Sequence, residues 1–182
     1  MRISATGETL RRMISMNDHK LKTLTITGIL TALIFVFTAY IHIPSFNGYV
    51  HIGDGLLYLA AALLPTPYAI FAGSVGAVLA DCLTGYAIWA PASFVIKLLT
   101  VLFFTAKGNR IIGKHNLLAL LPAALLCLGG YYVYEGLIFG NFISPLYGLF
   151  GNLMQAIFSS ILFAAAGLAF DKAGIKSRLS II

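Results

Sequence analysis

Residues 48–99 read GYVHIGDGLLYLAAALLPTPYAIFAGSVGAVLADCLTGYAIWAPASFVIKLL. Three apolar runs make up most of this stretch, and breaks that contain proline separate them at 65–67 and 89–91. Such runs, divided by proline turn signals, predict helices that end at the breaks. Because Asp54, Asp81 and Lys97 interrupt runs that are otherwise apolar, the stretch predicts membrane helices that carry a few buried ionisable groups.

The composition of the whole chain supports this interpretation. The chain has 182 residues, of which 59% are hydrophobic and 10% are charged, and its mean hydropathy is +0.92. These values are far from those of soluble domains. At ~20 residues per span, six spans use about 120 residues, which leaves no room for a soluble catalytic or nucleotide-binding domain. Any ATP-driven work would therefore fall to a partner chain.

Six apolar windows are candidate spans: residues 24–43, 52–64, 68–86, 92–106, 117–139 and 147–170. The window 52–64 is short enough to be a re-entrant or interfacial segment instead. Charge favours a crossing, because six crossings with the N-terminus inside place eleven of the twelve Lys and Arg residues on the cytosolic side. We therefore predict an all-α integral membrane protein, a bundle of six transmembrane helices whose N- and C-termini are cytosolic.

The predicted division of the chain follows from these windows. Residues 1–23 are predicted to be a basic, amphipathic, cytosolic segment, residues 24–171 to form the membrane domain, and residues 172–182 to be a cytosolic tail. The run 24–43 lacks an A-x-A cleavage site, which predicts a retained helix and not a signal peptide. The basic residues flank apolar runs, so the net charge of +6 reflects topology and not nucleic-acid binding. Cys82 and Cys127 lie inside apolar runs and are predicted to be buried free thiols, without a disulfide or a metal.

Small residues recur every four positions in three windows, which lets helix backbones approach closely in lipid. In the third and sixth windows these stripes predict packing within the chain. In the first window the stripe is Gly28 and Ala32, and its smooth face could meet another protein. The stripes of the third window are Ala69, Gly73 and Ala77 with Ala72, Gly76 and Ala80, and that of the sixth is Ala156, Ser160 and Ala164.

Four ionisable residues fall in the outer half of the predicted bundle. Asp81 and Lys97 lie at comparable depth across a short loop, so a buried ion pair between them is expected. Asp54 stands at the start of the second window, where a carboxylate can cap a helix, with ligand contact as the alternative. The fourth residue, Glu135, is left without a partner. His42 and His51 are expected to be solvated at the membrane surface, and no third ligand for a metal is evident.

In the predicted topology, side chains of the last three helices converge on one outward-facing pocket. Helical spacing aligns Trp89, Ser93 and Lys97 on one face of the predicted fourth helix. The fifth window offers Tyr131, or its neighbour Tyr132, one turn from Glu135. The alternative is a polar network that only fixes helix packing. The predicted substrate-binding residues are Trp89, Ser93, Lys97, Tyr131, Glu135, Tyr147, Asn152 and Gln155.

The arrangement resembles the substrate-binding S components of energy-coupling factor (ECF) vitamin transporters over roughly residues 24–170. The stretch 48–99 carries the resemblance, with an outer loop, a G-D start to the second helix, a Gly/Ala-rich third helix that ends in an acidic residue, and an A-P-x-x-F-x-x-K fourth helix. The resemblance implies a vitamin bound between the outer halves of helices four to six.

The same resemblance implies the partners of the chain. A small-x-x-x-small motif on helix one of such proteins docks a transmembrane T subunit, and the matching positions here are Gly28 and Ala32. Family members commonly have Ala at both positions, so Gly28 departs from the pattern. Two ATPase subunits would use ATP, and this chain would bind no cofactor itself. The location implied is the cytoplasmic membrane of a prokaryote.

Two other function classes compete with this interpretation. A stand-alone proton-coupled carrier could use Glu135 or Asp81. An intramembrane enzyme fits less well, because no serine has a partnered histidine and no carboxylates cluster on facing helices, so no catalytic residue is predicted. The aromatic and amide groups of the pocket suit a small heteroaromatic vitamin of the pyrimidine or pyridine type, such as hydroxymethylpyrimidine or pyridoxine, with riboflavin or pantothenate next.

Overall fold

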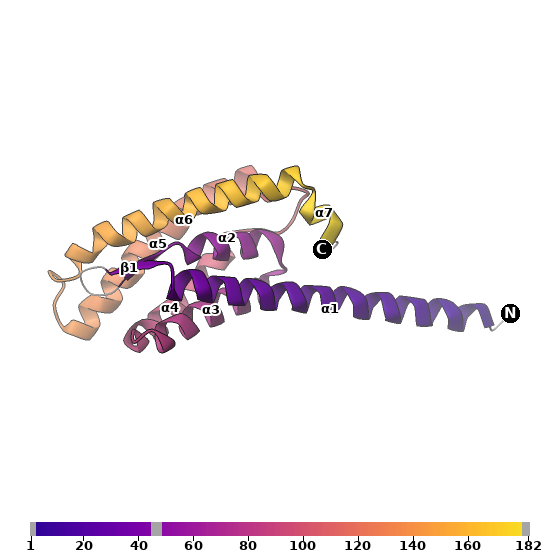
Figure 1. Ribbon diagram of the computed structural model, residues 1–182, viewed down its shortest axis with the longest axis horizontal. Coiled ribbons are helices and arrows are strands. Elements are labelled where there is room, and N and C mark those ends of the chain that lie inside the picture. Colours follow the sequence, from indigo (N-terminus) through magenta and orange to yellow (C-terminus); the bar gives the residue numbers. More distant parts are fainter. Residues whose placement is uncertain (1–2, 45–48, 180–182) are drawn as a thin grey trace.

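The computed structural model describes residues 3–44 and 49–179, with side chains from residue 18 onward. The chain is almost entirely helical, with one short hairpin near one end of the bundle (Figure 1). The elements are α1 (Ile3–Ala39), β1 (His42–Pro44), β2 (Tyr49–His51), α2 (Gly53–Leu63), α3 (Thr66–Leu83), a 3-10 turn (Ala87–Trp89), α4 (Ala90–Leu102), α5 (Lys114–Phe139), α6 (Leu146–Lys172) and α7 (Ile175–Leu179).

Four helices in the described residues are long and apolar enough to cross a membrane: α1, α3, α5 and α6. The apolar helices α2 and α4 are shorter, with 11 and 13 residues. At ~1.5 Å per residue, α2 is about half as long as the hydrocarbon core is thick. These features support a multi-pass α-helical membrane protein, while six full crossings and cytosolic termini stay predictions. The strands β1 and β2, which pair antiparallel, were not predicted.

The helix α1 differs most from its predicted window. It begins at Ile3 and ends at Ala39, whereas the window spans residues 24–43. The backbone is therefore helical across the predicted boundary at residue 23, and α1 extends well beyond the rest of the bundle (Figure 1). The predicted amphipathic character of residues 1–23 depends on side chains before residue 18, which lie outside the described residues.

The short helix α2 is the centre of the fold. All eleven of its residues are buried, and it contacts α1, α3, α4 and α6. A Cβ added to Gly55 would lie 2.7 Å from the Ser159 carbonyl oxygen, which shows how closely α2 approaches α6. A helix that is apolar on every side is stable only when protein or lipid surrounds it, and here its neighbours in the chain do so.

The small-residue stripes of α3 pack inside the chain, as predicted. A Cβ on Gly76 would lie 2.9 Å from the Thr31 carbonyl oxygen of α1, and one on Gly73 would overlap Leu57 of α2. Larger residues at these positions would force the helices apart. In the predicted α6 stripe, Ala156 is buried, whereas Ser160 and Ala164 are half-buried.

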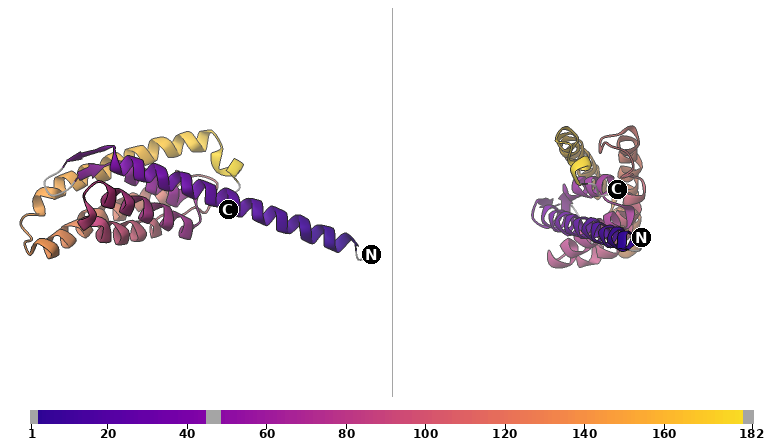
Figure 2. Two further views of the ribbon diagram at one scale, coloured as in Figure 1. Left: turned by 60° about the horizontal axis from the view of Figure 1, so that its bottom comes forward. Right: turned by 90° about the vertical axis from the view of Figure 1, so that its right-hand side faces the viewer.

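Both chain termini lie at one end of the bundle, and the β1–β2 hairpin lies toward the other (Figure 1). Figure 2 shows the terminal end from along the long axis, with the N- and C-termini facing the viewer. Asp171 near the end of α6 accepts hydrogen bonds from the backbone N–H groups of Ile111 and Ile112, at 2.7 and 2.9 Å. The loop between α4 and α5 is thereby held at the terminal end, together with its basic residues.

The two cysteines differ from one another. Cys127 is buried, as predicted, but Cys82 is exposed on α3. The prediction for Cys82 was wrong because an apolar run in a membrane helix has one face toward the chain and another toward lipid, and hydropathy does not distinguish them. Both thiols are free.

Candidate functional site

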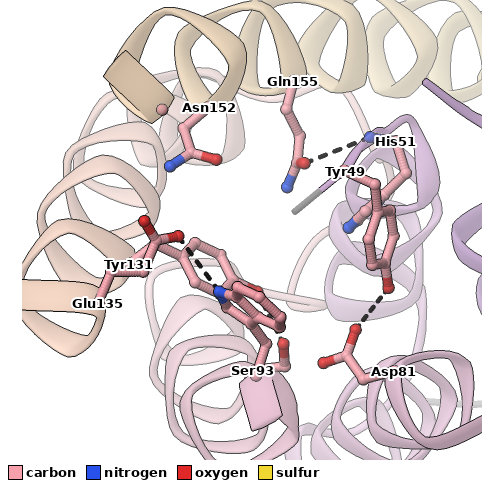
Figure 3. Close-up of a pocket in the computed structure, with 10 residues that line it drawn as sticks. Tyr49, His51, Asp81, Ser93, Tyr131, Glu135, Asn152 and Gln155 are labelled. Atoms are coloured by element: carbon pink, nitrogen blue, oxygen red, sulfur yellow. Dashed lines mark hydrogen bonds between the residues drawn. The ribbon is translucent and has the colours of Figure 1, made fainter. Parts of the chain in front are cut away.

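A cavity near the hairpin end is lined by side chains from five elements and from the 3-10 turn (Figure 3). The accessible cavity is about 40 Å³, within about 470 Å³ of empty space that is partly open to the outside. At ~10–15 Å³ per water on this measure, it has room for a few water molecules. Its lining residues are Tyr49, His51, Asp81, Trp89, Ser93, Tyr131, Glu135, Gly148, Asn152 and Gln155.

Local helix geometry explains why six of the eight sequence-predicted residues meet here. Tyr131 and Glu135 are one turn apart on α5, and Asn152 and Gln155 share one face of α6. The 3-10 turn ends at Trp89, directly before the first turn of α4, and a proline stands in that first turn. The six that line the cavity are Trp89, Ser93, Tyr131, Glu135, Asn152 and Gln155.

The other two predicted residues, Lys97 and Tyr147, lie outside the cavity lining. Lys97 is only 2% exposed and lies among the buried residues of the bundle. Tyr147 is 66% exposed and lines a separate apolar groove between the hairpin and α6. Tyr147 occupies the second position of α6, and the helical phase turns it away from Asn152.

The predicted ion pair between Asp81 and Lys97 is wrong. The Lys97 Nζ atom lies 2.7 Å from Oδ1 and 2.9 Å from Oδ2 of Asp54. It also lies 5.4 Å from the centre of the Tyr131 ring. Asp54 consequently does not cap α2, whose first turn has no side-chain capping bond. The central position of α2 brings Asp54 to the depth of Lys97, which the order of the residues along the chain does not reveal.

Gln155 connects the ion pair to the hairpin. Its Nε2 atom donates to Asp54 Oδ2 at 2.9 Å and contacts Cys127 Sγ at 3.8 Å, while its Oε1 atom accepts from the backbone N–H of His51 at 3.3 Å. Every member is buried. We call Asp54, Lys97 and Gln155 the floor network, because Gln155 lines the cavity and connects it to a buried ion pair whose polar groups satisfy one another.

Asp81 stands in a different environment. It is 4% exposed, and its Oδ1 atom accepts a short hydrogen bond from the Tyr49 hydroxyl. Its Oδ2 atom is buried and has no hydrogen-bond partner among the described residues. The Ser93 hydroxyl, which also lines the cavity, is 2.8 Å from Tyr131 Oη and is engaged there.

Glu135 also faces the cavity without a cation. It is 7% exposed, and its Oε1 atom accepts from Trp89 Nε1 at 3.2 Å. A Cβ on Gly148 would lie 3.8 Å from the other oxygen, Oε2, which is ordinary van der Waals contact, so α6 passes close to this oxygen. Within residues 18–44 and 49–179, neither Glu135 nor Asp81 has an ion-pair partner. We call Asp81, Glu135 and Asn152 the wall of the cavity.

The sequence did not predict the two hairpin residues, Tyr49 and His51, as part of the cavity. His51 was expected to be solvated, but it is 5% exposed and its Nδ1 atom accepts from the Gly53 N–H at 3.1 Å. His42 is half-buried and its ring lies 4.9 Å from that of Tyr49. The signal for these positions is the alternation Tyr49-Val50-His51 before the G-D start of α2, which is typical of a short strand.

Burial shifts the pKa values of both hairpin residues. For His51, burial and then the charge of Lys97 lower the pKa to about 4, while the charge of Asp54 opposes this. The imidazole is therefore neutral at pH 7, with its proton on Nε2 because Nδ1 is an acceptor. For Tyr49, burial and the neighbouring Asp81 carboxylate raise the pKa above its ordinary value, so its hydroxyl stays a donor.

Two further predictions concern metal binding and helix α1. The described part of the chain contains no group of three or more His, Cys, Asp or Glu residues that could hold a metal. Gly28 and Ala32 are both exposed on α1, and a Cβ added to Gly28 would meet nothing within 4 Å. This face is thus not used for packing within the described chain.

Comparison with known proteins gives two similarities. The profile of a family described as "ECF-type riboflavin transporter, S component" matches residues 18–172. A protein of Pyrococcus woesei, described as "Uncharacterized protein in gap 3'region", is 30% identical over 138 residues, which cover 72% of this chain and 88% of the relative. The family match covers every element of the structure from the middle of α1 to the end of α6, including all ten residues of the cavity lining.

Proposed function

The chain belongs to the family of ECF-type riboflavin transporter S components, and from this premise we propose that it binds one small heteroaromatic vitamin in the cavity at the hairpin end. The family is one of membrane transport proteins for vitamin uptake and not of enzymes, in line with the prediction from sequence. Membership also implies association with T and ATPase subunits. The specific vitamin and the specific partners are our proposals.

The observation that carries the proposal is the chemistry of the cavity. Trp89 and Tyr131 supply aromatic faces, and Asn152 presents an amide that makes no hydrogen bond to another described residue. Aromatic faces with a few convergent polar groups are typical of sites for small ring compounds. A network that served packing alone would leave fewer polar groups unsatisfied, because buried polar groups are normally paired.

The size of the cavity favours a ligand with one ring. An accessible volume of about 40 Å³ has to widen for any vitamin, and it has to widen less for a pyrimidine or a pyridine than for a three-ring flavin. We therefore propose hydroxymethylpyrimidine-like or pyridoxine-like compounds first. Riboflavin, which the family description names, comes next. Pantothenate ranks behind these because it has no ring to stack on Trp89.

We propose the exposed stripe of Gly28 and Ala32 as the docking face for the T subunit. Its support is that this smooth surface is left uncovered by the rest of the described chain, and small residues allow close helix contact in lipid. In this proposal the hairpin end faces outward and the termini are cytosolic, in the cytoplasmic membrane of a prokaryote. Two partner ATPases use ATP, and this chain carries no cofactor of its own.

Co-expression with T and ATPase subunits, followed by uptake and co-purification, tests the proposal. Ala32→Trp should reduce recovery of the complex and vitamin uptake, while the isolated protein keeps its ligand affinity because the cavity lies toward the other end of the bundle. Leu125→Trp is the matched control, since Leu125 is also exposed, on α5. Uptake that needs a proton gradient but no ATPase subunits would contradict the proposal and support the proton-coupled carrier.

A further inference from the structure

The floor and the wall of the cavity carry different net charge. In the floor network, the Lys97 ammonium neutralises the Asp54 carboxylate within 2.9 Å. In the wall, Asp81 and Glu135 are buried carboxylates without a cation among the described residues. Because His51 is neutral at pH 7, it does not compensate them. The lining therefore carries two uncompensated acidic groups.

The hydrogen-bonding groups left open toward the cavity are mainly acceptors. Asp81 Oδ2 has no partner, and Glu135 has one oxygen beyond the Trp89 contact. Both N–H groups of Gln155 are directed to Asp54 and Cys127, so this amide offers its remaining oxygen lone pair. Asn152 adds an acceptor oxygen and an amide group with two open N–H donors, and His51 adds its Nε2–H. The two carboxylates, however, can only accept, so a ligand that complements them has to place donors against Asp81 and Glu135.

The geometry places the two carboxylates on either side of an aromatic surface. In Figure 3, Glu135 and Asp81 approach the cavity from opposite sides, with Tyr131 between them. The Trp89 N–H is directed to Glu135, and the Trp89 ring, which lines the cavity, also packs near the rings of Tyr86 and Phe139. Aromatic faces attract cations, and a carboxylate taken out of water is stabilised most by a positive partner.

We propose that this cavity selects heteroaromatic vitamins with a net positive charge, carried by an ammonium or a cationic ring nitrogen, and rejects anionic ones. The inference rests on the proposed function and deepens it. The aromatic ring lies against Trp89 and Tyr131, and the cationic group lies between Asp81 and Glu135. An anion would meet two like charges without a compensating cation, because Lys97 is already held by Asp54.

A charge series of vitamins tests this inference on the purified protein in detergent at pH 7. Trp89 is the single tryptophan of the chain and lines the cavity, so its fluorescence reports binding at this site. The panel contains two cationic probes, thiamin and pyridoxamine, two neutral probes, pyridoxine and riboflavin, and two anionic probes, 4-pyridoxate and pantothenate. Pyridoxamine, pyridoxine and 4-pyridoxate share one ring and differ in net charge, so they are the matched set.

The expected result is that a cationic probe binds most tightly and that pyridoxamine binds about tenfold or more tightly than pyridoxine, the ratio for one charge-assisted hydrogen bond. Asp81→Asn should reduce that ratio, because it removes one of the two charges and keeps the shape. Asp18→Asn is the control for loss of a carboxylate, since Asp18 is exposed on α1, far along the chain from the cavity lining.

Two outcomes would overturn the inference and leave the proposed function intact. One is that the tightest probe is neutral or anionic. The other is that Asp81→Asn changes the pyridoxamine to pyridoxine ratio no more than Asp18→Asn does. If no probe of any charge binds to the purified protein, the proposed function itself is contradicted, and the inference falls with it.

Discussion

The floor and the wall of the cavity use the same residue types to opposite effect. In the floor network, Asp54, Lys97 and Gln155 satisfy one another through bonds of 2.7 to 2.9 Å. In the wall, Asp81 and Glu135 are almost as deeply buried but retain oxygens that no cation compensates. Buried charge costs free energy unless it is paired. The paired floor network therefore stabilises the fold, whereas the unpaired carboxylates of the wall are available to bind a ligand.

This difference indicates where function lies in a helical membrane bundle. The presence of a buried ionisable residue alone does not distinguish the two regions, because both have it. The unused hydrogen-bonding capacity does distinguish them. We therefore expect substitutions in the floor to change the free energy of unfolding, and substitutions in the wall to change the affinity for ligand.

The largest effect is expected from breaking the floor pair. Lys97→Met leaves Asp54 buried with its charge uncompensated, and the loss of one partner of a buried pair costs ~3–5 kcal/mol. Thermal or denaturant unfolding in detergent, without ligand, measures this change. The double variant Asp54→Asn with Lys97→Met removes both charges and should recover a large part of the loss. A double variant no more stable than the single would show that the pair does not stabilise the fold.

The second effect is a pH dependence that arises from His51. The unfolded chain takes up a proton near pH 6.5 whereas the folded His51 does so near pH 4, so folding is progressively disfavoured as the pH falls through this interval. The loss reaches at most on the order of 3 kcal/mol at pH 4. His51→Asn keeps an acceptor for the Gly53 N–H but does not titrate. The unfolding free energy of wild type minus that of this variant should fall between pH 6.5 and 4; a constant difference would contradict the burial of a neutral imidazole.

A third substitution, Asp81→Asn, distinguishes the wall from the floor by the direction in which it changes the free energy of unfolding. It removes the charge of a buried carboxylate that has an unsatisfied oxygen, and the Asn oxygen can still accept from Tyr49. The unfolding free energy should stay within about 1 kcal/mol of wild type or rise. Melting without ligand is the measurement. A loss comparable with that of Lys97→Met would place Asp81 in the structural network instead.

A similarly small effect is expected at the hairpin. Tyr49→Phe removes the hydroxyl that donates to Asp81 but keeps the ring contacts with His42 and Tyr86. A single hydrogen bond contributes ~0.5–1.5 kcal/mol, so the melting temperature should fall slightly. Tyr40→Phe, at an exposed tyrosine beyond the end of α1, is the control. Equal melting temperatures for the two variants would show that the Tyr49 bond does not hold the hairpin.

Hydropathy located the four long helices because each contains a long apolar run, whereas six crossings stay a prediction. The ends of α5 and α6 differ from the predicted windows by at most three residues. Helix periodicity also predicted six of the ten cavity residues, because Tyr131 with Glu135 and Asn152 with Gln155 share helix faces irrespective of how the bundle is assembled.

The partner of Lys97 could not be predicted because it depends on the assembly. Asp54 and Asp81 are both near its depth, and the choice between them depends on the central position of α2. The hairpin was missed for a related reason: strands of three residues carry too short a pattern to stand out from a loop. His51 and Tyr49 were therefore absent from the predicted site.

Whether the wall is the binding surface is tested most directly by calorimetric titration of wild type and Glu135→Gln with pyridoxamine, pyridoxine and riboflavin, together with melts of both proteins without ligand. Glu135→Gln keeps the shape of the side chain and its contact with Trp89 but removes the charge. We predict that binding of the tightest of these ligands weakens by ~1.5–3 kcal/mol, at an unchanged melting temperature. Unchanged affinity in the variant, or a melting temperature that falls as far as that of Lys97→Met, would contradict the assignment of the wall as the binding surface.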